Sequence, residues 1–171
     1  VGGALGRAFS EVGHDVVFGV RDPDSDKTRT ALSSAPGTSA SSPSEAVAEL
    51  PSLDARVVID AMNRFGGDRN RSTADDLADA LPGARVVKAF NTTGFENLST
   101  GRDRKTPAAM FVAGDDVDAK DVAMRLAREI GFDPHDGGPL ANAKVLEDMV
   151  KVWLALSQQH GRRVAFAISE S

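Results

Sequence analysis

The sequence predicts an α/β fold, with a doubly wound and mainly parallel sheet and helices at the C-terminal end. Segments with apolar residues at three- and four-residue spacing alternate along the chain with short runs rich in valine. This is the pattern of helices that alternate with buried parallel strands. Polar residues follow three of the expected strands, and ligands of such sheets bind at the carboxyl ends of the strands. The sequence therefore also predicts a ligand crevice at that edge.

The first part of the chain is expected to contain one helix and two strands. Apolar residues recur at helical spacing over 1–12, and Gly13 is suited to end that helix. The run VVFGV at 16–20 predicts a strand that is buried on both faces. Residues 28–44 are rich in Ser, Thr, Ala, Pro and Gly, and they are expected to form a loop with a short strand near 38–40.

The rest of the chain continues the alternation. Apolar runs predict four more strands, at 56–60, 85–90, 108–113 and 132–136. Helices are predicted at 44–50, 72–81 and 117–130, with one or two long helices over 140–166. Ser72 and the pair Asp115–Asp116 are suited to cap the helices that they precede. Glu147, on the last helical segment, is interpreted as a packing or interface residue rather than a catalytic base.

Composition and charge exclude several classes of function. The 171 residues are 41% hydrophobic and 26% charged, as in a folded soluble domain. The chain has no cysteine, which excludes disulfides and thiolate catalysis, and its three histidines lack the spacing of a metal site. A net charge of −5 disfavours nucleic acid as a partner. Because no apolar run approaches a membrane span and no signal peptide opens the chain, a cytoplasmic location is expected.

The opening residues have the character of half a dinucleotide-binding unit. Gly2 and Gly3 precede the first helix, and a strand follows it, as in a βαβ unit whose helix N-terminus takes a pyrophosphate. If Gly2 is the third glycine of that fingerprint, Val1 lies beside the pyrophosphate; the alternative is an ordinary glycine-rich turn. Arg21 ends the next strand, where a guanidinium suits the 2′-phosphate of NADP, although Asp22 could favour NAD or cap the turn.

Longer strings resemble one family. The opening string GGALGRAFSEVGHDVVFGVRDP resembles the start of the coenzyme F-420-dependent NADP oxidoreductase family, which consists of small Rossmann-type reductases. Further strings follow in the family's order: VVIDAMN, VVKAFNTTGFENL, MFVAGDD and IGFDPHDGGPLANAKVLEDM. The resemblance covers the chain from Val1 to about Phe166 and implies a Rossmann-type fold.

The resemblance implies a site for NADP(H) on the adenosine side. Val1 and Gly2 fall in the pyrophosphate turn, and Val20 and Arg21 fall where the family reads the adenosine 2′-phosphate. The family often has Ser at the position of Val20. Valine removes that hydroxyl donor, so the phosphate would lose one hydrogen bond, worth about 1.5–3 kcal/mol when it is charge-assisted.

On the nicotinamide side the resemblance implies three further cofactor contacts. Asn63 ends the strand that flanks the nicotinamide ribose, and Asn91 and Thr92 lie where the nicotinamide meets the deazaflavin. The implied reaction is hydride transfer between the nicotinamide and a deazaflavin (coenzyme F-420) or a similar small-molecule acceptor. No catalytic side chain and no metal is expected, since proximity and exclusion of water promote hydride transfer. The alternatives are a flavin acceptor, an NADP-binding redox sensor without turnover, and a degenerate scaffold without a cofactor.

The resemblance also implies that the chain is divided into two parts. Residues 1–139 are expected to form the NADP-binding domain, and 140–171 a helical segment that packs on it or forms a homodimer. The family's first strand and one internal βα unit before the strand at 56–60 are missing by this comparison. The chain also opens without Met, inside a motif. The sequence is therefore expected to be an incomplete version of a longer protein.

Overall fold

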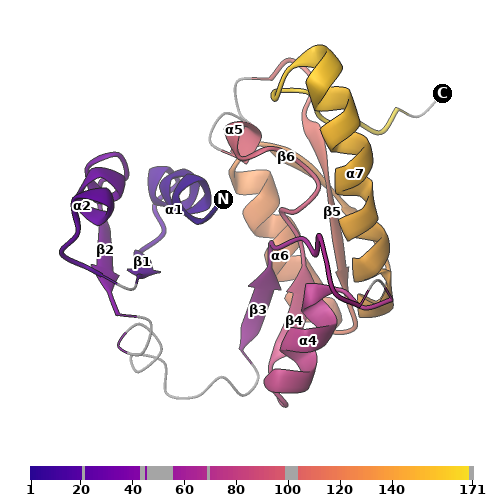
Figure 1. Cartoon of the computed structure of the whole chain (residues 1–171), viewed down its shortest axis with the longest axis horizontal. Coiled ribbons are helices and arrows are strands. Elements are labelled where there is room, and N and C mark those ends of the chain that lie inside the picture. The colour runs from indigo at the N-terminus through magenta and orange to yellow at the C-terminus, as the bar shows by residue number, and fades with distance from the viewer. Residues whose placement is uncertain (21, 43–44, 46–55, 69, 99–103, 170–171) are drawn as a thin grey trace. The chain divides into compact units, whose positions relative to one another are not determined.

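The chain forms two compact units, Val1–Ser52 and Leu53–Ser171 (Figure 1). The computed structural model describes residues 1–20, 22–42, 45, 56–68, 70–98 and 104–169. Apart from residue 45, the predicted helix at 44–50 lies outside these ranges. The expected division after residue 139 falls inside the second unit, which holds both the later strands and the C-terminal helix. That residues 1–139 act as one nucleotide-binding domain stays a prediction.

The described residues of the first unit include two parallel strands and the helices α1 and α2. Helix α1 (Gly2–Glu11) leads into strand β1 (Val16–Gly19), and helix α2 (Asp26–Ser33) leads into strand β2 (Thr38–Ser41). The two strands pair in parallel, with Val16 opposite Thr38. This arrangement confirms the predicted helix at the start of the chain, the strand after it and the short strand near 38–40.

Helix α2 corrects the prediction of a loop over 28–44. Its sequence, DKTRTALS, has too few apolar residues for a helical period to be visible. The helix begins instead at a cap: the Ser25 hydroxyl accepts the backbone N–H of Thr28 at 3.2 Å, and Asp26 places a carboxylate in the first turn. Capping, rather than amphipathic periodicity, thus marks this helix in the sequence.

Strand β1 is less buried than predicted. Its residues alternate between half-buried and exposed, and Val17 is 42% exposed. The prediction that both faces of this strand are buried was therefore wrong. Among the residues that the structure describes, β1 pairs with β2 alone, and a strand with one partner in so small a sheet has little to cover its second face.

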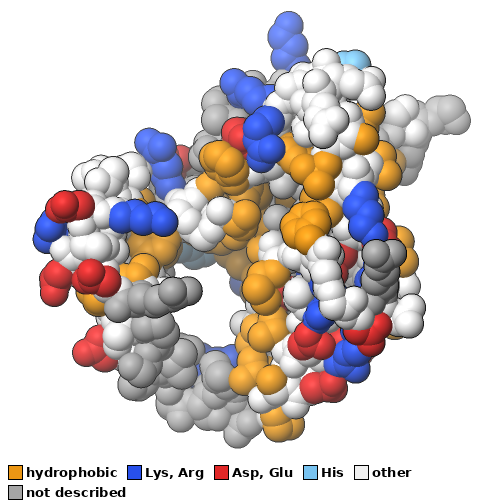
Figure 2. Space-filling model, viewed as in Figure 1, with side chains coloured by type: hydrophobic (Ala, Val, Ile, Leu, Met, Phe, Trp, Pro, Cys, Tyr) orange, Lys and Arg blue, Asp and Glu red, His pale blue; other side chains and the backbone are white. Residues whose placement is uncertain are grey.

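The second unit is a four-stranded sheet with helices. Its strands and helices are β3 (Val57–Asp60), α4 (Thr73–Ala80), β4 (Arg85–Lys88), α5 (Phe95–Leu98), β5 (Ala108–Gly114), α6 (Val117–Glu129), β6 (Phe132–Asp136) and α7 (Ala143–His160), which a short 3₁₀ turn (Leu140–Asn142) precedes. The strand order is β3-β4-β5-β6, and every pair is parallel except β4–β5. The mainly parallel α/β fold predicted from the sequence is thus confirmed. Figure 2 shows hydrophobic side chains at the surface where β3 lies, and Val57, Val58 and Ile59 are only half-buried.

Side chains of β4 alternate between the two faces of this sheet. Lys88 reaches Thr73 at the start of α4 and Glu147 on α7. Its neighbour Val87 lies on the other face, where its Cγ2 and the Cγ of Lys120 on α6 are each 3.3 Å from the position of a Cβ on Gly114. The sheet therefore lies between α4 and α7 on one side and α6 on the other. Helix α6 buries a stripe of alanines that lets it approach the sheet closely: Ala119, Ala123 and Ala127.

Helix α7 is shorter than the helical segment predicted over 140–166. It ends at His160, and Gly161 leaves it with a φ of +83°, a conformation that glycine adopts without strain. Trp153 Nε1 on this helix donates to the carbonyl of Val164 at 2.7 Å, and the chain then returns to β5, where the N–H of Ala109 donates to the carbonyl of Phe166 at 2.8 Å. No helix in the described part of the chain is long and apolar enough to cross a membrane. A homodimer through this helix stays a prediction; Val145 and Val152 are 58% and 55% exposed on it.

Gly6 is the glycine that lets α1 pack on β1. A Cβ at Gly6 would overlap the ring of Phe18, whereas a Cβ at Gly3 would have no atom within 4 Å. We expect Gly6→Val to destabilise the first unit by about 1–3 kcal/mol through overpacking. Hydrogen exchange at the amides of α1 and β1 measures this loss. Gly3→Val is the matched control, and Phe18→Ala combined with Gly6→Val should restore protection; equal protection in both single variants would contradict this account.

Candidate functional site

Two predicted site residues meet at the carboxyl ends of β3 and β4. Asn91 Nδ2 donates to Asn63 Oδ1 at 2.9 Å, and Asn63 Nδ2 donates to the backbone carbonyl of Asn91 at 3.1 Å. Asn91 Nδ2 also donates to the carbonyl of Leu146 on α7 at 3.0 Å. The expectation that polar residues after parallel strands converge is confirmed for this pair, and Thr92 follows Asn91 directly.

A backbone bend at Phe90 directs Asn91 toward α7. Phe90 has a φ of +60°, the only positive φ of a non-glycine residue in the described ranges. A left-handed conformation costs an ordinary residue about 1–2 kcal/mol. The ring is buried and the N–H of Phe90 contacts Met110 Sδ at 3.1 Å, so packing holds the bend in place. Strained residues of this kind concentrate at functional sites.

The strand end carries two hydrogen-bond acceptors that no protein group uses. Asn91 Oδ1 and Thr92 Oγ1 are buried and have no partner. Each unsatisfied buried polar atom costs about 1–3 kcal/mol, and native proteins rarely keep such atoms without a reason. The two atoms belong to residues that the resemblance places beside a nicotinamide.

A buried ion cluster lies directly behind this pair. Lys88 is fully buried at the end of β4, and its Nζ lies 2.8 Å from Asp60 Oδ2 and 2.7 Å from Glu147 Oε1. It also donates to the carbonyl of Met62 at 2.7 Å and to Thr73 Oγ1 at 2.9 Å. Every proton of the ammonium group therefore has an acceptor within reach, which a buried charge requires.

The carboxylates of this cluster also hold the loop between β3 and α4. Asp60 Oδ1 accepts the N–H of Met62 at 2.9 Å, and Glu147 accepts the N–H groups of Arg64 at 3.2 Å and Thr73 at 2.8 Å. Burial on its own raises the pKa of the Glu147 carboxyl, but the hydrogen bonds from Lys88 and Thr73 outweigh it and hold that pKa below its ordinary value. Glu147 therefore stays ionised, and the loop that carries Asn63 is pinned at both ends.

Sequence reasoning missed most of this cluster. Lys88 and Thr73 were not singled out, Asp60 was considered only as one of the polar residues at a strand end, and Glu147 was interpreted as a packing or interface residue. The signal was present: Glu147 lies at helical spacing between Ala143 and Val150 on the apolar face of its helix. A charged residue on such a face is buried and needs a buried counter-charge.

The first unit has a separate cavity beside two other predicted site residues. It has a volume of about 610 Å³ and is lined by Gly3, Phe18, Gly19, Val20, Asp22, Ser25, Lys27, Thr28 and Ala31. Val20 thus faces a cavity at the end of β1, as the 2′-phosphate assignment requires. Arg21 lies outside the described residues, so its role stays a prediction. Lys27, which the sequence analysis did not select, supplies a cation to the lining, and Asp22 supplies an anion.

The start of α1 agrees with only part of the glycine argument. Val1 precedes the helix without a side-chain cap, and no acidic residue lies in the first turn. Gly2 and Gly3 have no atoms within 4 Å of a Cβ position, so their backbone is open to a ligand. Close packing on the strand falls to Gly6 rather than to Gly2, and the pyrophosphate contacts of Val1 and Gly2 stay predictions.

Comparisons with known proteins extend this description. No family model matches the chain. It is 34% identical to the metalloreductase STEAP3 of Rattus norvegicus over 98 residues, which are 56% of this chain and 20% of that protein. It is 26% identical over 98 residues to the human metalloreductase STEAP2, with 57% of this chain and 20% of the relative covered. The chain thus spans about a fifth of the length of these curated relatives.

Two solved structures share the fold. One, from Arthrobacter sp. FB24, is described provisionally as an F420-dependent NADP reductase; it matches with a TM-score of 0.85 and 21% identity over 99% of this chain and 95% of that one. The other is a hypothetical protein of Sinorhizobium meliloti, with a TM-score of 0.69, 22% identity and 82% of each chain covered. The first match confirms the Rossmann-type fold that the resemblance implies.

The buried ammonium can be tested by removing it. We expect Lys88→Met to destabilise the second unit by about 3–5 kcal/mol, because two buried carboxylates would lose their counter-charge. Urea denaturation measures the free energy of unfolding, with Lys105→Met as the surface control. Adding Glu147→Gln to Lys88→Met should recover part of the loss. A single variant as stable as the wild type would contradict the account.

The lowered pKa of Glu147 makes stability depend on pH. A carboxyl whose pKa is lower in the folded chain stabilises it above the ordinary pKa of about 4.3, and this contribution disappears as the pH falls through the lowered value. We expect Glu147→Gln to be less stable than the wild type at neutral pH, and the difference to shrink as the solution is acidified below about pH 4. Thermal melts across pH measure it, with Asp121→Asn, exposed on α6, as the control. A difference that does not change with pH would sink the explanation.

Proposed function

We propose that the chain is an NADP(H)-dependent oxidoreductase that transfers a hydride between the nicotinamide and a deazaflavin, such as coenzyme F-420, or a similar ring acceptor. The observation that carries the proposal is the pair of unsatisfied acceptors, Asn91 Oδ1 and Thr92 Oγ1, which follow the end of β4. They lie where the resemblance assigns the nicotinamide. The shared fold of the Arthrobacter structure supports the same class of reaction.

The residues of the second unit fit a nicotinamide. Its carboxamide carries two N–H donors, which suit acceptors such as Asn91 Oδ1 and Thr92 Oγ1. Asn63 holds Asn91 in place through two hydrogen bonds, so the acceptors are fixed before a ligand arrives. A site that is rigid in this way loses less conformational entropy when it binds.

The residues of the first unit fit the adenosine phosphates in part. The cavity beside Val20 holds Lys27, whose ammonium suits a 2′-phosphate, and the uncapped start of α1 presents open backbone at Gly2 and Gly3. Asp22 in the same lining opposes a phosphate and suits a ribose hydroxyl. The preference for NADP over NAD therefore depends on the cations Arg21 and Lys27 outweighing Asp22.

Hydride transfer requires no acid or base from the side chains of the protein. A bound nicotinamide supplies the hydride, so the protein needs to position the ring and exclude water. Asn63 and Asn91 do the positioning, and the Lys88 cluster fixes the loop that carries Asn63. The metalloreductase relatives are reductases by name, and the chain covers a fifth of their length, so their metal substrate is not part of this proposal.

Selective binding of NADPH is the first test. We expect the full chain to bind NADPH about tenfold or more tightly than NADH, the ratio that one charge-assisted hydrogen bond supplies. Arg21→Gln and Lys27→Gln should each lower that ratio toward one while leaving NADH binding unchanged. Isothermal titration calorimetry measures both nucleotides, with Lys105→Gln as a control of equal charge change.

The outcomes separate the alternatives. If neither nucleotide binds, the proposed function is wrong, and the result favours a degenerate scaffold without a cofactor. Equal binding of both would assign the cavity to NAD through Asp22. Hydride transfer to coenzyme F-420 or a flavin is monitored by the absorbance of NADPH. Tight binding of NADPH with no such transfer would favour a redox sensor.

A further inference from the structure

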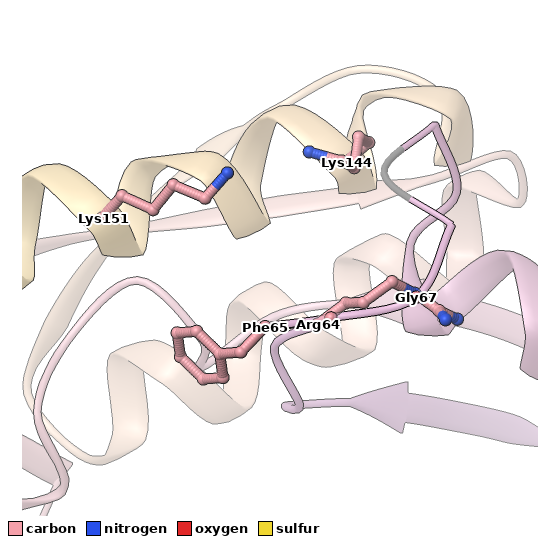
Figure 3. A pocket seen from close by; sticks show the side chains of 6 residues that line it. Arg64, Phe65, Gly67, Lys144 and Lys151 are labelled. Carbon is pink, nitrogen blue, oxygen red and sulfur yellow. The ribbon is translucent and has the colours of Figure 1, made fainter.

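The second unit has a cleft that the proposed nicotinamide contacts do not use. It lies between the loop after β3 and helix α7, has a volume of about 390 Å³, and is lined by Arg64, Phe65, Gly66, Gly67, Lys144 and Lys151. Figure 3 shows the two lysines on one side of it, with Phe65 and Gly67 on the facing loop. We call it the loop–helix cleft.

The helix side of the cleft is positively charged. Lys144 Nζ lies 2.5 Å from Asp148 Oδ2 and Lys151 Nζ lies 2.6 Å from Asp148 Oδ1, so two ammonium groups share one carboxylate. Hydrogen bonds from Lys144 and then Lys151 lower the pKa of Asp148, which keeps that carboxylate ionised. One positive charge is left over, and each ammonium keeps further N–H donors for an anion. Figure 3 shows the two ammonium groups directed toward each other along the helix.

The loop side of the cleft is held by its backbone. The guanidinium of Arg64 extends away from the lysines and forms an ion pair with Asp76, and the Arg64 N–H donates to the buried Glu147 at 3.2 Å. Because the Arg64 side chain is neutralised elsewhere, the lysines decide the charge of the cleft. Because its backbone is anchored, the neighbouring Phe65 is presented from a fixed position.

Phe65 is exposed without a structural reason. The residue is 72% exposed, although burying a phenylalanine side chain is worth about 1.5–3 kcal/mol. Gly66 beside it has no atom within 4 Å of a Cβ position, so the loop is open at this point. An open aromatic face next to an excess of positive charge suits a planar ring that carries an anionic group.

The cleft adjoins the proposed site for the nicotinamide. Phe65 comes two residues after Asn63, and Lys144 lies on the same helix as Leu146, whose carbonyl accepts Asn91 Nδ2. We propose that the loop–helix cleft binds the redox acceptor through its anionic substituent, a phosphate or carboxylate, with Lys144 and Lys151 contacting the anion and Phe65 stacking on the ring. This assignment rests on the proposed function and specifies its acceptor as an anionic ring compound.

A pair of flavins that differ only in a phosphate tests the assignment. We expect flavin mononucleotide to bind the full chain about tenfold or more tightly than riboflavin, the ratio that one charge-assisted hydrogen bond supplies. The double variant Lys144→Gln/Lys151→Gln should bring this ratio close to one without weakening riboflavin. Phe65→Leu should weaken both flavins equally. Quenching of flavin fluorescence gives the binding constants without turnover. The control is Lys105→Gln. Lys120 is left unchanged in the control because it forms an ion pair with Asp136.

The same titrations can overturn the assignment. The assignment fails if the wild type binds the two flavins equally or binds neither of them. It also fails if the double lysine variant still prefers flavin mononucleotide over riboflavin. Coenzyme F-420 titrated in parallel distinguishes a deazaflavin from a flavin, and its binding should be lost in the same double variant. NADPH oxidation with riboflavin as the acceptor separates the two proposals. If this oxidation occurs but flavin mononucleotide binds no more tightly than riboflavin, the oxidoreductase proposal stands and the cleft assignment fails.

Discussion

A lysine ammonium group sealed inside the second unit constrains the structure around it. Lys88 is fully buried, and a charge of this kind is tolerated only where acceptors surround it. The acceptors come from three separate segments: Asp60 at the end of β3, Met62 and Thr73 at the two ends of a loop, and Glu147 on α7. The cluster therefore acts as a cross-link between strand, loop and helix. The cluster contributes mainly by fixing how the strand, the loop and the helix are arranged, because a buried ion pair adds little net stability compared with an apolar replacement.

The loop and the helix that this cluster joins line the loop–helix cleft and hold Asn91, one of the two proposed nicotinamide contacts. Asn63 follows Met62, and its partner Asn91 is held by the carbonyl of Leu146, the neighbour of Glu147. Arg64 is fixed by the same glutamate, and Phe65 follows it. The buried ion cluster thus holds the loop against α7. A ligand that binds here meets a frame that is already formed.

Local patterns in the sequence predicted the elements but not the interactions between distant residues. Valine-rich runs located β3, β4 and β5, and the rule that parallel strand ends converge brought Asn63 to Asn91. Helix α2 escaped because a polar helix shows no apolar period, although Ser25 marks its start. The partners of Lys88 escaped because Glu147 is 59 residues away from it along the chain, and no local period encodes such a pairing. The Gly6–Phe18 contact escaped for the same reason, since it depends on how closely a helix approaches a strand.

The distribution of satisfied and unsatisfied polar groups separates support from function. In the Lys88 cluster every buried polar atom has a partner, whereas Asn91 Oδ1 and Thr92 Oγ1, in the two residues after the bend at Phe90, have none. A bend and two unpaired acceptors each lower stability, so their occurrence next to a fully paired network is hard to explain as a packing defect. A cofactor amide that donates to these acceptors would remove that penalty on binding. On the proposed function, the Lys88 cluster would hold the strand end in shape, and the acceptors that Asn91 and Thr92 leave unpaired would select the cofactor.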